Sequence, residues 1–281
     1  MTPQLHDLDL YLHRLGYDAA PAPTLDTLRE LQLRHTSTFA FETLAALLHA
    51  PVAVDLRSLQ QKLLHDGRGG YCYELNRLFL ALLQDLGFEA RGVTGRVVMG
   101  GPEDALPART HLFVQATVAG APYLADVGFG SMVPTGPLRL DSEQAQAMPH
   151  GDYRVSRFGE GYILRARVGD EWRGLYVFDL QATAEIDYVV GNWYVSTHPE
   201  SPFRGQLFAA RMGPGVRKTL RNGSYAVHRL GAASERRELE DAGAVLAVLR
   251  GELGIRVPDD SDIYAAISRR LAQGRDSGLG G

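Results

Sequence analysis

Asp66-Gly-Arg-Gly-Gly-Tyr-Cys-Tyr-Glu-Leu-Asn76 is the stretch around which this chain is organised. It contains Cys72, the only cysteine among 281 residues, and three closely spaced glycines come just before it. A helical pattern then covers 74–86, which places the cysteine at or beside the start of a helix. The unpaired N–H groups and positive dipole end of a helix favour a thiolate there. A lone cysteine is more often a small buried apolar residue, so a reactive thiol requires a base elsewhere.

The composition describes a folded and mildly acidic protein. Hydrophobic residues make up 45% and charged residues 22% of the chain, and the net charge is 29 − 33 = −4. This balance gives no electrostatic reason to expect nucleic acid or an anionic membrane as a partner. The first residues lack the order of a signal peptide, and the longest apolar runs are far too short to span a membrane. One cysteine forms no intrachain disulfide, so we expect a cytoplasmic protein.

The first ninety residues are expected to be helical. Leucines recur at helical spacing in the ranges 5–16, 24–35, 55–67 and 74–86. Thr24 and Asp55 are suitable N-caps for the second and third of these helices. Cys72 therefore belongs to the last helix of a helical part.

The sequence changes character after Gly87. Short runs rich in Val, Thr, Tyr and Phe, separated by Gly and Pro, predict strands at 89–98, 109–118, 122–127, 152–157, 161–168 and 171–178. The Gly169-Asp170 step fits a hairpin turn. Because these strands follow one another without intervening helices, we expect an antiparallel sheet or barrel rather than a doubly wound sheet.

The last third returns to mixed structure. The patterns predict a connecting helix at 183–197, strands at 206–211, 215–221 and 224–230, and helices at 241–252 and 260–272. Asn222-Gly223 is a strong hairpin signal, and the glycine-rich end, 274–281, is expected to fray. The fold class is therefore α+β.

His111 and Asp126 are the candidate base and orienting carboxylate. His111 lies inside the predicted strand 109–118, and Asp126 lies in an apolar strand beside a glycine turn. Both could simply face solvent, but neighbouring antiparallel strands lie about 5 Å apart, so two side chains on one face could touch. Histidine takes up a thiol proton near neutral pH, and a carboxylate fixes its tautomer. The other histidines lie at predicted helix ends, in loops or on exposed faces, and His35 is expected to be structural.

Residues 68–76 resemble the Arg-Gly-Gly-x-Cys-x-Glu-x-Asn signature of the arylamine N-acetyltransferase family at every fixed position. Residues 41–44, Phe-Glu-Thr-Leu, look like the family's Phe-Glu-Asn-Leu box, with Thr43 in place of Asn. Further segments similar to the family follow in its order, at 95–97, 110–112, 126–130 and 192–203. The last of these segments is expected to pack between lobes. The resemblance covers most of the chain from about residue 35 to 203.

The resemblance implies a cysteine-protease-like Cys-His-Asp core shared between lobes. Its plan divides the chain into a helical bundle with the nucleophile (1–88), an antiparallel β-barrel with His and Asp (89–182), an interdomain helix and linker (183–205) and an α/β lid (206–281). It also implies a triad of Cys72, His111 and Asp126. An acetyl group would pass by a ping-pong route from acetyl-CoA to Cys72, and then to an arylamine, arylhydrazine or related amine.

The resemblance also implies roles for residues around the triad. Aromatic and apolar walls of the acceptor pocket would come from Phe41, Val97 and Phe129, each of which could equally be ordinary core. The CoA-binding segment would include Gly128, Gly130, Ser131 and Thr135, although many relatives have glycine where Ser131 stands. Arg68 and Glu42 would form a scaffold that holds the glycine loop.

The expected partners are an acyl-CoA donor and a small amine acceptor, with no metal, nucleic acid or membrane, in a monomer or homodimer. Three alternatives remain open at this level. The chain could be an amide synthase of the same family that acts on a biosynthetic acyl chain. It could be a cysteine hydrolase or transglutaminase-like enzyme, because the same trio serves acyl transfer to water or peptide amines. It could also be a non-catalytic binding protein built on the same fold.

Overall fold

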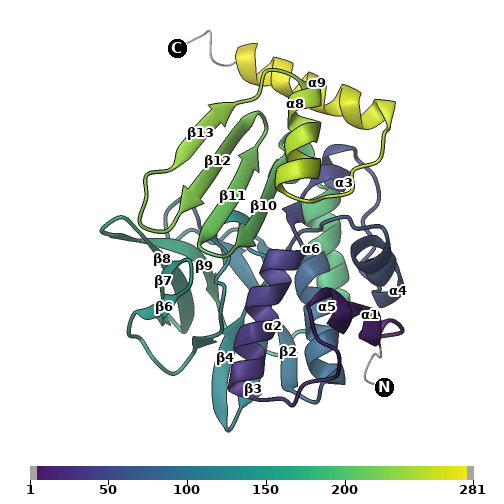
Figure 1. Cartoon of the computed structure of the whole chain (residues 1–281). Coiled ribbons are helices and arrows are strands. Elements are labelled where there is room, and N and C mark those ends of the chain that lie inside the picture. Colours follow the sequence, from purple (N-terminus) through teal and green to yellow (C-terminus); the bar gives the residue numbers. More distant parts are fainter. Residues whose placement is uncertain (1–4, 277–281) are drawn as a thin grey trace.

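The helical part lies beside a large sheet in the computed structural model, which describes residues 5–276 (Figure 1). Its helices are α1 (Leu8–Arg14), α2 (Leu25–Thr38), α3 (Leu44–Leu47), α4 (Leu56–Gln60) and α5 (Cys72–Asp85). The Thr24 and Asp55 side chains cap α2 and α4, as predicted, by accepting the main-chain N–H groups of Thr27 and Ser58. Leucines of α2, α4 and α5 form one buried cluster that continues onto the back of the sheet. This packing holds the start of α5 against the barrel.

An eight-stranded antiparallel sheet forms the centre of the molecule. Its strands are β2 (Glu89–Val97), β3 (Arg109–Val118), β4 (Ala121–Ala125), β5 (Leu138–Arg139), β6 (Gln146–Met148), β7 (Gly151–Phe158), β8 (Gly161–Val168) and β9 (Glu171–Phe178). The strand order is β5-β4-β3-β2-β9-β8-β7-β6. The Gln146 side chain exchanges two hydrogen bonds with the Arg139 main chain, which links the edge strands β5 and β6 and nearly closes a barrel. The predicted antiparallel barrel is confirmed.

The position of Asp126 differs from the prediction. Strand β4 ends at Ala125, which pairs with Val114, so Asp126 lies just beyond the strand rather than within it. The Asp126 carboxylate accepts the main-chain N–H of Gly128 at 2.8 Å. An aspartate that bonds its own backbone two residues on forms a turn, which ends the ladder there.

The lid, residues 206–276 of the described chain, carries a second antiparallel sheet. Its strands are β10 (Phe208–Gly213), β11 (Val216–Arg221), β12 (Ser224–Arg229) and β13 (Glu235–Glu238). Helix α8 (Ala242–Ala247), the π-helical turn η3 (Val248–Glu252) and helix α9 (Ser261–Asp276) lie against this sheet at the top of Figure 1. Strand β1 (Phe41–Glu42) pairs with β10, and Leu44 of α3 packs into the lid's apolar cluster. A short segment from the helical part is thus built into the lid.

The connecting segment lies between the other parts, as expected for residues 192–203. Helix α6 (Glu185–Thr197) is followed by α7 (Pro202–Gly205). The Asn192 side chain accepts the Tyr71 hydroxyl and donates to the Val52 carbonyl oxygen at 2.9 Å. The Phe203 ring contacts the rings of Phe41, Tyr71 and Phe208. These contacts join the segment both to the residue before Cys72 and to the lid.

Two predicted helices are not regular throughout. The pattern at 55–67 corresponds to α4 followed by a π-helical turn, η1 (Gln61–His65), and 241–252 corresponds to α8 followed by η3. A π-helical turn of five residues is too short to be distinguished from an α-helical one by leucine spacing. Helix α9 extends through Asp276, and 277–281, part of the end expected to fray, lie outside the described residues.

Candidate active site

Cys72 is the first residue of α5 and is only 4% exposed. The preceding glycine loop pairs with the chain on either side of Phe41: Gly70 donates its N–H to the Ala40 carbonyl, and Glu42 donates its N–H to the Gly70 carbonyl. A Cβ atom at position 69 would lie 2.4 Å from the Ala40 oxygen, so only glycine allows this approach. The loop therefore fixes where the cysteine sulfur lies.

His111 of β3 and Asp126 are in direct contact. His111 Nε2 lies 2.7 Å from Asp126 Oδ2, and the two side chains are 2% and 0% exposed. The Cys72 sulfur lies 3.5 Å from the Thr110 carbonyl oxygen, next to His111 in the chain, and it also influences the charge of the ring. Burial alone would lower the pKa of His111, but the attraction and hydrogen bonding of Asp126 and Cys72 raise it to about 9. The three predicted residues are therefore brought together, and the His111 ring is favoured in its protonated form.

The Asp126 carboxylate is saturated with hydrogen-bond donors. Its Oδ2 also accepts the Tyr176 hydroxyl at 3.0 Å, and its Oδ1 accepts Asn76 Nδ2 at 2.9 Å in addition to the Gly128 N–H. Burial alone would raise the pKa of Asp126, but His111 and these donors hold it below its ordinary value. Sequence reasoning missed Tyr176 because it resembles any core residue of a buried strand.

Gln32 of α2 is a second residue that sequence reasoning missed. Its buried side-chain amide lies within hydrogen-bond distance of three main-chain oxygens, those of Asp126 at 3.0 Å, Pro134 at 2.9 Å and Gly136 at 3.1 Å. The amide has only two protons, so the three oxygens share them. Gln32 thus ties both ends of the 126–136 loop to the helical part. A polar residue on the leucine face of α2 was the available signal.

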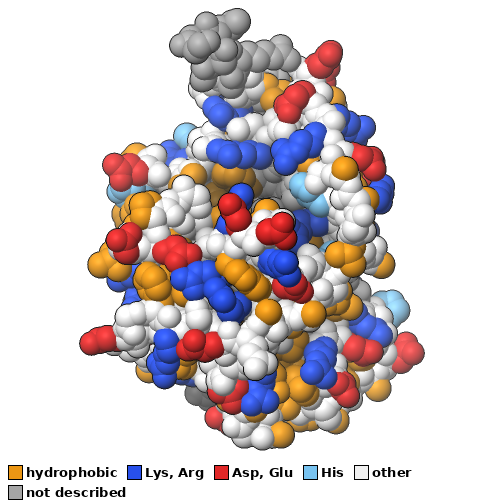
Figure 2. Space-filling model, turned by 90° about the vertical axis from the view of Figure 1, so that its left-hand side faces the viewer, with side chains coloured by type: hydrophobic (Ala, Val, Ile, Leu, Met, Phe, Trp, Pro, Cys, Tyr) orange, Lys and Arg blue, Asp and Glu red, His pale blue; other side chains and the backbone are white. Residues whose placement is uncertain are grey.

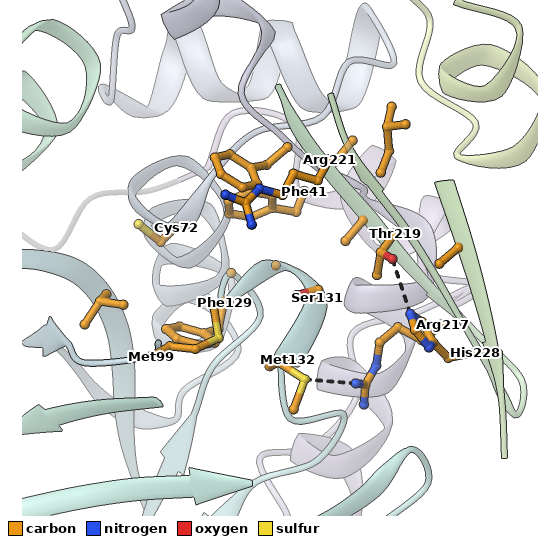
Figure 3. Close-up of a pocket in the computed structure, with 18 of the residues that line it drawn as sticks. Phe41, Cys72, Met99, Phe129, Ser131, Met132, Arg217, Thr219, Arg221 and His228 are labelled. Atoms are coloured by element: carbon orange, nitrogen blue, oxygen red, sulfur yellow. Dashed lines mark hydrogen bonds between the residues drawn. The ribbon is translucent and has the colours of Figure 1, made fainter. Parts of the chain in front are cut away.

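A cavity of about 1140 Å³ opens onto Cys72 and His111 between the barrel and the lid. Among the predicted pocket residues, Phe41, Val97 and Phe129 all line it. The cavity wall also contains Gly128, Gly130 and Ser131. Figure 3 shows Cys72 at the start of its helix, with Phe41 and Phe129 on either side of the space in front of it.

Thr135 is placed differently from the other predicted CoA contacts. It is buried and does not belong to the residues that line the cavity. Its hydroxyl lies 3.1 Å from Nδ1 of His150, which does line the cavity. Thr135 is therefore connected to the cavity wall through His150.

The lid side of the cavity is strongly basic. The lining residues there include Arg217, Arg221, His228, Arg229 and Arg236. Basic side chains also gather around a hollow in this face of the molecule (Figure 2). Arg217 contacts the Met132 sulfur at 3.1 Å and donates to the His150 carbonyl oxygen at 3.0 Å, and no carboxylate of residues 5–276 forms an ion pair with it. The wall is therefore suited to an anion.

Arg68 and Glu42 form an ion pair beside the glycine loop, not in the cavity. Arg68 Nη2 lies 2.7 Å from Oε1 of the buried Glu42, whose Oε2 accepts the Leu44 N–H at 2.6 Å. Neither side chain lines the cavity. Over the described range 5–276, no group of three His, Cys, Asp or Glu side chains could hold a metal ion, and no helix could cross a membrane.

The combination of a buried Cys-His-Asp trio and a cavity at the junction of helical bundle, barrel and lid defines a cysteine-dependent enzyme of the acyl-transferring class. A family model described as N-acetyltransferase matches residues 24–262. Curated relatives named arylamine N-acetyltransferase are 38% to 41% identical to this chain over nine-tenths or more of its length. The chain belongs to the arylamine N-acetyltransferase family.

Individual relatives match over nearly their whole length. The enzyme of Mycolicibacterium smegmatis is 41% identical, covering 94% of this chain and 98% of the relative, and that of Escherichia coli is 38% identical, covering 92% and 91%. The solved structure of the Mycobacterium marinum enzyme superimposes with a TM-score of 0.91 at 42% identity, covering 94% of this chain and 100% of that one. The same enzyme solved in complex with CoA gives a TM-score of 0.89 and covers 94% of this chain and 99% of that one.

Proposed function

We propose that this chain is an acetyl-CoA-dependent arylamine N-acetyltransferase that carries the acetyl group on Cys72. The observation that carries this proposal is the buried contact of His111 with Asp126 at 2.7 Å, beside Cys72 and at the wall of a cavity of about 1140 Å³. Family membership and the CoA complex of a close relative support acetyl-CoA as the donor.

The reaction follows from the charge state of the trio. The Cys72 thiolate attacks the thioester carbonyl carbon, the bond from that carbon to the CoA sulfur breaks, and His111 gives its proton to the departing CoA thiolate. The amine nitrogen of the acceptor then attacks the acetylated cysteine and loses a proton to His111 as the Cys72 thiolate leaves. Asp126 stabilises the imidazolium and keeps its Nε2 side occupied, so the other side of the ring faces the reacting groups.

The cavity offers different surroundings to the two substrates. Phe41, Val97 and Phe129 provide flat apolar walls close to Cys72 that suit an aromatic acceptor. The main chain of Gly128 and Gly130, together with Ser131, would contact the donor, and the basic side chains of the lid would attract its phosphates. We assign Thr135 only an indirect role through His150, and we assign Arg68 and Glu42 to the scaffold of the glycine loop.

We further infer that the parts divide at 1–88, 89–182, 183–205 and 206–281, and that the protein works in the cytoplasm as a monomer or homodimer. The net charge of −4 supports partners that are small molecules rather than nucleic acid or an anionic membrane.

Intact-mass measurement after incubation with acetyl-CoA tests the proposed function. We expect one acetyl adduct on Cys72 that disappears when an arylamine is added and never forms in Cys72→Ala. His111→Gln, in which a neutral amide replaces the base, should form the adduct at least about a hundredfold more slowly. Absence of any adduct between pH 6 and 9 in the folded wild-type protein would refute the proposal.

A further inference from the structure

A second buried ion pair lies beside the glycine loop, and it has no part in the chemistry described so far. Lys62 Nζ lies 2.5 Å from Oε1 of Glu74, and the two side chains are 21% and 0% exposed. Lys62 is one of only two lysines in the chain, beside Lys218, whereas arginine provides every other basic side chain apart from histidine. Its Glu74 carboxylate adjoins Gly70, whereas the Glu42 carboxylate of the first pair adjoins Gly69.

We propose that Lys62 is a positioning residue for Cys72, which neutralises Glu74 and so allows a carboxylate to cap the helix that carries the thiolate. The inference deepens the proposed function, because it rests on Cys72 being the nucleophile.

The Glu74 side chain stabilises the first turn of α5. Its Oε2 accepts the Tyr71 N–H at 3.1 Å, which satisfies one of the unpaired donors at the start of the helix. A Cβ atom at Gly70 would lie 2.8 Å from the Glu74 Cβ, so the glycine makes room for this carboxylate. The negative charge that fixes the loop therefore lies only two residues from Cys72, in the same turn.

Lys62 also contacts the start of the glycine loop. Its main-chain carbonyl accepts the Arg68 N–H at 3.1 Å, while its side chain reaches Glu74 after the loop. Lys62 belongs to the π-helical turn η1 (Gln61–His65), a geometry that is rare and often occurs near functional sites. One residue thus joins the beginning of the loop to the helix that follows it.

The electrostatic need for Lys62 follows from the groups around Glu74. Burial raises the pKa of Glu74, Lys62 lowers it, and the neighbouring carboxylate of Glu42, itself paired with Arg68, raises it. An unpaired Glu74 carboxylate would oppose a thiolate at Cys72, because like charges disfavour each other's ionised forms. The titratable groups whose pKa values Cys72 influences are His111, Tyr71 and Tyr73.

The test measures the rate of Cys72 alkylation by iodoacetamide from pH 5 to 9. We expect Lys62→Met to react about tenfold more slowly at pH 7, with its profile moved to higher pH. Lys62→Arg should retain the wild-type profile. Lys62→Met/Glu74→Gln should recover most of the lost rate, because the opposing charge is gone. Lys218→Met, which removes a pair with Glu252 at 2.8 Å in the lid, is the matched control and should not change the profile.

Glu74→Gln alone is an independent test if Lys62→Met fails to fold. It keeps an acceptor for the Tyr71 N–H and leaves the Lys62 charge uncompensated, so its profile should move to lower pH. A wild-type profile in Lys62→Met, or a double variant as slow as Lys62→Met, would overturn the proposal, as would an unmoved profile in Glu74→Gln. Alkylation needs no acetyl-CoA, so these results can be told apart from a failure of acetyl transfer.

Discussion

Two buried histidines show how neighbouring groups decide the charge of a side chain in this protein. His111 contacts a carboxylate and has its pKa raised to about 9, whereas burial alone lowers the pKa of His35 to about 3. His35 lies among the rings of Tyr11, Phe39 and Phe79, and neither of its ring nitrogens has a hydrogen-bond partner within the described residues. The same residue type is therefore a base in the barrel and an apolar filler in the helical bundle.

The buried position of His35 predicts that the protein becomes less stable as the pH falls. The unfolded chain binds a proton at His35 near pH 6.5, while the folded chain holds the ring neutral down to about pH 3. Its contribution is therefore complete above pH 6.5 and is lost as the pH falls from there toward 3. His35→Phe keeps the ring without the titration, so its free energy of unfolding should fall by about 2–3 kcal/mol less than that of the wild type between pH 7 and 4.5.

Urea unfolding at the two pH values measures this difference. His13→Gln, at an exposed position of α1, is the control and should follow the wild type. Equal losses in His35→Phe and the wild type would contradict the assignment of acid sensitivity to His35.

At the scale of elements, the contact between the turn after β4 and the start of α5 sets the site. A Cβ atom at Gly128 would lie 2.6 Å from Asn76 Nδ2 and 2.8 Å from the Cys72 Cα. Gly128→Ala must therefore push the turn away from the helix, and with it Asp126. We expect the free energy of unfolding to fall by about 1–3 kcal/mol and Cys72 alkylation at pH 7 to slow by roughly tenfold.

Thermal melting and alkylation of the same preparation measure both effects. Gly101→Ala is the matched control, because the nearest atom to its Cβ would be 3.9 Å away. A Gly128→Ala variant with the wild-type melting temperature and alkylation rate would show that the turn yields without moving the site.

The elements that the sequence predicts well are those with a clear local period. Strands β3, β8 and β9 have the predicted bounds, because apolar alternation and turn residues mark both of their ends. Strand β1 has two residues and is stabilised by pairing with β10, far along the chain, so no local pattern indicates it. Strand β13, Glu-Arg-Arg-Glu, is exposed throughout and shows no apolar alternation.

The same distinction holds for the site. Cys72, His111 and Asp126 could be found because each residue type is unusual in its local sequence. Tyr176 and Gln32 could not, because their roles depend on a hydroxyl reaching a carboxylate in another strand and on an amide reaching the main chain of a distant loop. Contacts of that kind exist only once the helical part and the barrel have packed together.

At the scale of the whole molecule, each part contributes a different chemical character to one cavity. The helical part brings the nucleophile and the Phe41 ring, the barrel brings the base and the Phe129 ring, and the lid brings a row of basic side chains. Figure 3 shows Arg217 and His228 on the lid strands, across the cavity from Cys72. A donor that reaches from the lid to the cysteine can thus place its anionic end and its thioester in different parts of the molecule.

This arrangement predicts that the lid recognises the phosphates of the donor and not its acyl group. Arg217→Met should raise the KM for acetyl-CoA by about tenfold, because a charge-assisted contact to phosphate contributes about 1.5–3 kcal/mol. The kcat/KM for p-nitrophenyl acetate, an acetyl donor without phosphates, should change by less than about twofold, since its reaction depends on Cys72 and His111. Initial rates at low ionic strength measure both constants, and added salt should weaken acetyl-CoA binding in the wild type.

Arg173→Met, which removes an exposed pair with Glu171 in β9, is the control. Equal losses with both donors would mean that Arg217 supports the fold of the cavity, and no loss with acetyl-CoA would place the phosphates elsewhere.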